Sequence, residues 1–170
     1  MLTITVDTTA AREVLEKFPE MANRAIRQAM RSTVRTAKQE AIDLATRRYT
    51  ANGSIIRSAI KSSSGGNRGE LSASGARNPL EKFIVTPKGA RLGRGRYLHA
   101  EVVRGQGGNL SKAFWRGGGV SERVGRERFP IRRLKSVSAP GMLAVDQVRE
   151  PLMQVMNREF EVGFWRAIGL

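Results

Sequence analysis

The chain has 170 residues, of which 40% are hydrophobic; this suits one domain with a buried core and excludes wholesale disorder. It contains no cysteine, which excludes disulfides, thiolate metal sites and cysteine nucleophiles, and it has no run of about 18–20 apolar residues that would cross a membrane. The net charge of +15 predicts attraction to polyanions or to acidic protein surfaces, without choosing between them.

The first part of the chain is expected to hold one short strand and a long helix. Residues 2–6 (LTITV) predict the strand, and residues 10–18 (AAREVLEKF) predict a short helix. Pro19 suits the first turn of a helix over about 19–49. This helix is the best-supported element, because its apolar and small residues recur at helical spacing. They are Ala22, Ile26, Ala29, Met30, Thr33, Val34, Ala37, Ala41, Leu44 and Ala45.

A row of basic side chains follows the same helix at spacings of three and four residues. We call it the basic row: Arg24, Arg27, Arg31, Arg35 and Lys38. Residues at these spacings share one face of a helix, here beside the apolar face. One interpretation is an ordinary solvated surface. The sharper hypothesis is an assembly surface that meets an acidic neighbour or a phosphate backbone.

The middle of the chain is expected to be rich in strands. Residues 54–61 predict a short amphipathic helix, after which the apolar period approaches two. Strands are predicted at 70–74, 82–87, 97–103, 120–124 and 131–137, and glycine-rich segments at 62–69, 89–96 and 105–111 predict mobile loops. Strands so close in sequence, without helices between them, favour an antiparallel sheet.

The last element expected is a helix over about 142–168, kinked or restarted at Pro151. The sequence therefore predicts an α+β fold in a single domain over 1–170. An antiparallel sheet would carry the long N-terminal helix packed across it, together with the C-terminal helix. The β-rich middle, about 70–137, is strongly basic: from Lys88 to Lys135, thirteen lysines and arginines stand against three glutamates.

Catalytic chemistry finds little support in the sequence. His99 is the only histidine; it would share a strand face with Glu101, but a single histidine in a strand is usually structural. No motif or metal-ligand spacing is present, so neither enzymatic activity nor a cofactor or metal is expected.

Nucleic-acid binding is the stronger alternative function, because arginines neutralise phosphates and aromatic rings stack on bases. The aromatic candidates are Phe83, Tyr97, Phe114, Trp115 and Phe129, although core packing is favoured for Phe83 and Phe129.

Three segments carry a resemblance to a known family. They are ARNPLEKFIV (76–85), KAFWRGGG (112–119) and RERFPIRRLKSVSAPGM (126–142). Together with the long basic helix before them, their order resembles the phage minor tail protein Z family, and the resemblance covers nearly the whole chain.

The resemblance implies a structural, non-catalytic virion protein of a bacteriophage or prophage tail, of the tail completion type, that acts at the head–tail junction. Implied partners are other tail or neck proteins (tail terminator, tail tube or head-completion proteins) and further copies of the chain in a homo-oligomeric ring, with a monomer expected in isolation. Contact with DNA would be non-specific, and no membrane is involved. The implied location is the virion tail or neck, and the host cytoplasm during assembly.

Two further sets of residues are singled out on this basis. Phe129, Pro130 and Ile131 would pin the entry of a strand into the core, and Pro140 with Gly141 would form the turn that aims the C-terminal helix. A small acidic set would face the basic row of a neighbouring copy: Asp7, Glu13, Glu16 and Glu20.

Overall fold

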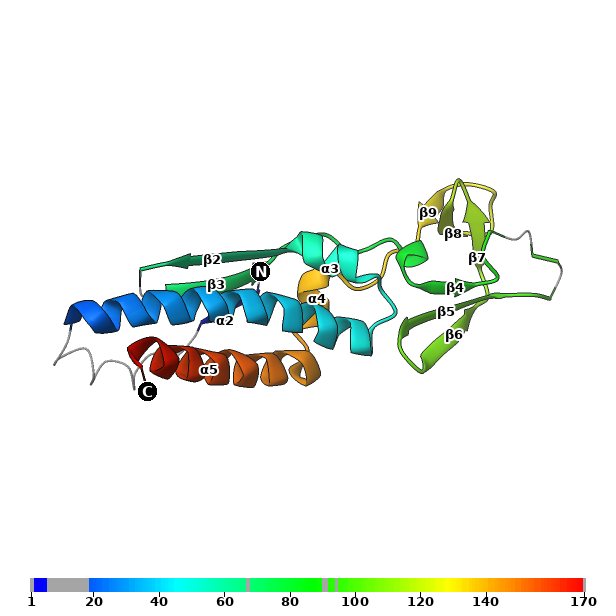
Figure 1. Cartoon of the computed structure of the whole chain (residues 1–170). Coiled ribbons are helices and arrows are strands. Elements are labelled where there is room, and N and C mark those ends of the chain that lie inside the picture. The colour runs from blue at the N-terminus through cyan, green and yellow to red at the C-terminus, as the bar shows by residue number, and fades with distance from the viewer. Residues whose placement is uncertain (1, 6–18, 67, 90–91, 94, 170) are drawn as a thin grey trace.

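The structure is a computed structural model that describes residues 2–5, 19–66, 68–89, 92–93 and 95–169, and it is elongated (Figure 1). Its elements, in chain order, are β1 (Leu2–Thr5), α2 (Pro19–Arg48), α3 (Gly53–Ala59), β2 (Ile60–Gly65), β3 (Arg68–Ala73), the 3-10 turn η1 (Leu80–Lys82), β4 (Ile84–Thr86), β5 (Leu98–Val103), β6 (Gln106–Leu110), β7 (Ala113–Arg116), β8 (Gly119–Arg123), β9 (Ile131–Arg133), α4 (Ala139–Leu143) and α5 (Asp146–Ile168).

Helix α2 is the central layer of one end of the molecule. It lies between α5 on one side and the antiparallel sheet β1-β3-β2 on the other (Figure 1). Gly163 of α5 lies against α2, where an added Cβ would come within 3.3 Å of Ser32 Oγ. Gly69 of β3 lies against the other side, where an added Cβ would be 2.8 Å from Val34 Cγ2. The two glycines therefore allow α2 to pack closely on both neighbours.

The core of this end follows the predicted apolar periodicity. Of the positions predicted on α2, Leu44 is half-buried and the rest are buried: Ala22, Ile26, Ala29, Met30, Thr33, Val34, Ala37, Ala41 and Ala45. The facing side of α5 buries Val148, Leu152, Met156 and Phe160. Because these residues recur every three or four positions, each helix places one continuous apolar stripe against its neighbours.

The other end of the molecule holds two antiparallel sheets of three strands each, β4-β5-β6 and β7-β8-β9 (Figure 1). Backbone hydrogen bonds connect it to the end of α2: Thr50 N donates to Val102 O at 3.0 Å, and Arg104 N donates to Arg48 O at 2.8 Å. Two chain segments connect the two ends, one between β3 and η1 and one between β9 and α4. They bond to each other, since Ser136 N donates to Asn78 O at 2.7 Å. Direct contacts as well as covalent connections thus position the small sheets against the helices.

The α+β class with a long N-terminal helix, antiparallel sheet and C-terminal helix is confirmed, but the strands form three sheets rather than one. Only the sheet β1-β3-β2 packs along α2. Among the described residues, no helix is long and apolar enough to cross a membrane.

Two loop predictions are wrong. Residues 62–65 belong to β2, residues 68 and 69 to β3, and residues 106–110 form β6, because backbone pairing with β3 and β5 needs no apolar alternation. The C-terminal helix is interrupted at Ala144 and Val145, between α4 and α5, and it continues through Pro151. The helix predicted at 10–18 lies outside the described residues, as do Asp7, Glu13 and Glu16.

Candidate functional site

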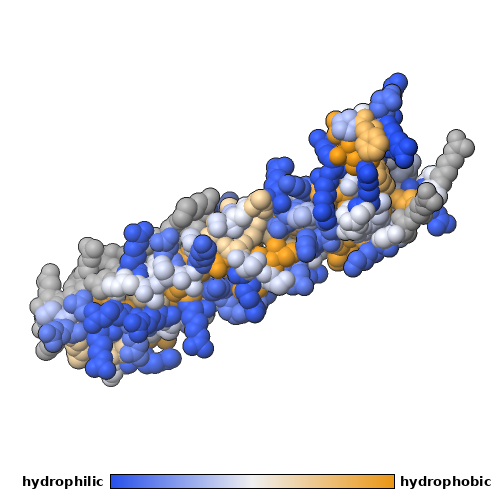
Figure 2. Space-filling view, turned by 90° about the horizontal axis from the view of Figure 1, so that it is seen from above, coloured by the Kyte–Doolittle hydropathy of each residue, from blue (hydrophilic) through white to orange (hydrophobic). Residues whose placement is uncertain are grey.

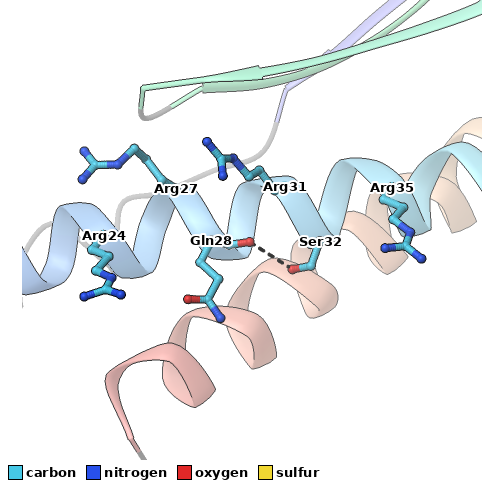
Figure 3. Close-up of a pocket in the computed structure, with 6 residues that line it drawn as sticks. All are labelled: Arg24, Arg27, Gln28, Arg31, Ser32 and Arg35. Atoms are coloured by element: carbon cyan, nitrogen blue, oxygen red, sulfur yellow. Dashed lines mark hydrogen bonds between the residues drawn. The ribbon is translucent and has the colours of Figure 1, made fainter.

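The basic row lies on an exposed side of α2, as its spacing predicts. Arg24, Arg27, Arg31 and Arg35 are exposed, and Lys38 is half-buried. The four arginines line an open depression of about 520 Å³ together with Gln28 and Ser32 (Figure 3). A helix places residues at these spacings within one stripe, so the row presents a continuous cationic surface over several turns.

Neighbouring elements flank this surface on both sides. Arg27 and Arg31 share a narrow cleft with Ser64 and Gly65 at the end of β2. On the other side Gln28 and Ser32 extend toward α5 (Figure 3). Ser32 Oγ donates to Ala29 O at 2.8 Å, which holds this hydroxyl against the helix backbone. The depression is therefore a shallow trough between the hairpin and α5, with guanidinium groups along its length.

No member of the basic row forms an ion pair with any residue that the structure describes. The ion pairs among the described residues join Arg132 to Glu122, Arg133 to Glu81, Arg149 to Asp146 and Arg158 to Glu159. The one acidic residue in the first turn of α2 is Glu20, which is exposed. Positive charge on the row is thus not neutralised within the described chain, which favours binding of an external anionic group.

A second cationic surface lies at the opposite end of the molecule, on the sheet β7-β8-β9. We call it the arginine–aromatic cluster: Phe114, Arg116, Arg123, Arg128 and Phe129. The Cζ atoms of Arg116 and Arg128 lie 5.5 and 5.8 Å from the centre of the Phe129 ring, and that of Arg123 lies 6.0 Å from the Phe114 ring. Figure 2 shows hydrophobic orange bordered by hydrophilic blue at this end.

The predicted role of Phe129 in the core is wrong. Its side chain is 56% exposed, Pro130 is also exposed, and Ile131 is half-buried. Residues 124–130 form a loop that is closed by a hydrogen bond from Val124 N to Pro130 O at 3.0 Å. This loop holds the Phe129 ring near two arginines on the surface, where cation–π attraction replaces the expected core packing.

The other predicted anchor residues start a helix instead of a simple turn. Pro140 and Gly141 belong to the first turn of α4, and the Ser138 side chain caps that helix by accepting from Gly141 N at 3.3 Å. Proline suits this position because its missing N–H would be unpaired there anyway.

The remaining aromatic candidates for base stacking separate clearly by burial. Phe83 is buried, as core packing requires, while Tyr97 is 50% exposed. Trp115 is half-buried, and its indole Nε1 donates to Pro87 O at 2.8 Å. Phe114 is half-buried and Phe129 is exposed, so the arginine–aromatic cluster holds two of the accessible rings.

The two sequence candidates for catalysis are held in separate local interactions. His99 Nδ1 lies 3.1 Å from Asn109 Oδ1 on the neighbouring strand, and Glu101 Oε1 accepts from Gly105 N at 2.8 Å. Among the described residues there is no group of three or more histidine, aspartate or glutamate side chains placed to hold a metal ion.

Glu81 is the described carboxyl group with a shifted pKa. Burial acts to raise the pKa of Glu81, but backbone hydrogen bonds, among them one from Val120 N, and the paired Arg133 guanidinium together hold that pKa below its ordinary value. This carboxylate joins η1 to β8 and β9, so we interpret it as part of the structure of this end.

Sequence reasoning found the basic row but not the arginine–aromatic cluster. Arg116 and Arg123 come from different strands, and only the pairing of Phe114 with Ser121 places them on one face with Phe114. The RFP sequence within a basic segment was the signal in the sequence that could have indicated the cluster. The chain matches no protein-family model, no curated protein and no solved structure.

Proposed function

We propose that this chain is a structural protein of a bacteriophage or prophage tail, a tail completion protein acting at the head–tail junction without catalysis. The observation that carries the proposal is the unneutralised basic row along a long, packed helix. A rigid cationic surface of this kind suits docking on a fixed acidic neighbour. The tail assignment itself rests on the order of the three segments that resemble the minor tail protein Z family.

The proposed partners are other tail or neck proteins, such as the tail terminator, tail tube or head-completion proteins, and further copies of this chain in a ring. A net charge of +15 on each copy opposes self-assembly, because identical cationic surfaces repel one another. The isolated protein is therefore expected to be a monomer or small oligomer, which assembles fully on an acidic tail end. The virion tail or neck is its proposed location.

The test replaces Arg24, Arg31 and Arg35 together by glutamine in the phage that encodes the chain. The three side chains are exposed, so circular dichroism should show an unchanged fold. Complementation of a null phage should then yield fewer infectious particles and less of the protein in purified tails.

A matched control removes the same charge elsewhere. Arg57, Lys61 and Arg77 are also exposed and belong to none of the described ion pairs. Their triple replacement by glutamine should leave the number of infectious particles at the wild-type level. Wild-type numbers from the Arg24, Arg31 and Arg35 variant would instead return the basic row to an ordinary solvated surface.

A further inference from the structure

We propose that the arginine–aromatic cluster is a binding site for single-stranded nucleic acid, without sequence preference. A base would stack on Phe129, and Arg116, Arg123 and Arg128 would contact the phosphates on either side. This inference concerns the opposite end of the molecule from the basic row, and it does not depend on the function proposed above.

The first support is the accessibility of a ring among cations. Phe129 is 56% exposed, and the Cζ atoms of two arginines lie within 6 Å of its ring centre, one from β7 and one from its own loop. Accessible aromatic rings bordered by arginine are the arrangement that binds bases and phosphates together. Stacking requires access to the ring, and more than half of the Phe129 side chain is exposed to solvent.

The second support is that several such groups share one face of the sheet. Phe114 pairs with Ser121, and Arg116 pairs with Gly119, so both point to the same face as Ser121 and Arg123. Arg123 lies 6.0 Å from the Phe114 ring. Phe114 therefore offers a second, partly exposed ring on the sheet face that also carries Arg116.

The chemistry of the cluster favours nucleic acid over an acidic protein segment. All five members end in planar groups, two phenyl rings and three guanidinium groups. Guanidinium groups stack on bases and also form paired hydrogen bonds with phosphate oxygens. Carboxylate side chains would engage the arginines but would leave the faces of both rings unused. Unpaired strands expose base faces, whereas duplexes do not, which selects single-stranded nucleic acid.

The local charge also favours a polyanion. The loop that carries Arg128 and Phe129 contributes Arg126 in addition. Glu122 on β8 is paired with Arg132, and Glu127 is the one acidic residue of the loop 124–130. The surface around Phe129 is thus strongly positive, and counterion release would favour binding of phosphates.

The experiment measures fluorescence anisotropy of a labelled oligothymidine with the full chain over a range of salt concentrations. Arg116, Arg123 and Arg128 replaced together by glutamine should weaken binding by about tenfold or more and should reduce the salt slope by about 2, at about 0.7 for each phosphate contact. Phe129→Ala should weaken binding by at least about fivefold, while Phe129→Trp should retain it. Circular dichroism checks the fold of each variant.

The matched control replaces Arg57, Lys61 and Arg77 by glutamine, which removes the same charge from exposed positions outside both cationic surfaces. Binding of oligothymidine should then change by less than about threefold. Equal weakening by the two triple variants would overturn the site, since attraction would follow net charge alone. Three other results would also overturn the proposed site. They are unchanged binding of oligothymidine by Phe129→Ala, an affinity for duplex DNA equal to that for oligothymidine, and preferential binding of poly-glutamate over oligothymidine.

Discussion

Truncation of Ile26 tests the packing of α2 most directly. The Ile26 side chain is 1% exposed in the core of α2. Replacement by alanine removes buried methyl groups and leaves a cavity, which lowers the free energy of unfolding by about 2–5 kcal/mol. Ile26→Asp should cost more, because a carboxylate would be buried without a partner. Arg27→Ala removes an exposed side chain on the next position and should change stability by less than about 0.5 kcal/mol.

Urea and thermal denaturation followed by circular dichroism measure these differences. For a chain of this size, a loss of about 3 kcal/mol lowers Tm by about 6–12 °C. The expected order of Tm is wild type and Arg27→Ala together, then Ile26→Ala, then Ile26→Asp. If Arg27→Ala lowers Tm as much as Ile26→Ala, the assignment of buried and exposed faces on α2 is refuted.

Three further predictions concern single positions in the described fold. Thr33 Oγ1 is buried without a hydrogen-bond partner among the described residues. Thr33→Val should therefore raise the free energy of unfolding, measured by urea denaturation, by about 1 kcal/mol. A lower free energy of unfolding in this variant would contradict the prediction. Gly69→Ala should lower the free energy of unfolding by about 1–3 kcal/mol, because the new Cβ would press on Val34. In the control Gly65→Ala the new Cβ meets no atom within 4 Å, so the free energy of unfolding should change little. The pKa of Glu81 lies below its ordinary value, so the stabilisation by its charged form is present at neutral pH and is lost as the pH falls through that lowered pKa. The stability difference between wild type and Glu81→Gln should therefore be larger at pH 7 than at pH 3.

The basic row was predictable because a helix converts sequence spacing directly into position. Arg24, Arg27, Arg31 and Arg35 recur every three or four residues, and the structure places all four on one exposed side of α2. Whether this side is an assembly surface stays a prediction, since that depends on a partner. The arginine–aromatic cluster was not predictable in the same way, because strand pairing and a loop bring its members together.

The sequence by itself determined the long helix α2, the C-terminal helix α5 and the α+β class. Apolar residues at helical spacing depend on local geometry alone, so α2 and the buried face of α5 follow from the order of residues. The β2–β3 hairpin and the exposure of Phe129 depended on the tertiary structure. Strand β2 has five exposed residues out of six and therefore no apolar alternation, yet its backbone pairs with β3. Phe129 resembles a core residue in sequence, but the closed loop and the arginine from β7 hold its ring at the surface. Both outcomes come from backbone pairing and contacts between distant segments, which a local pattern does not encode.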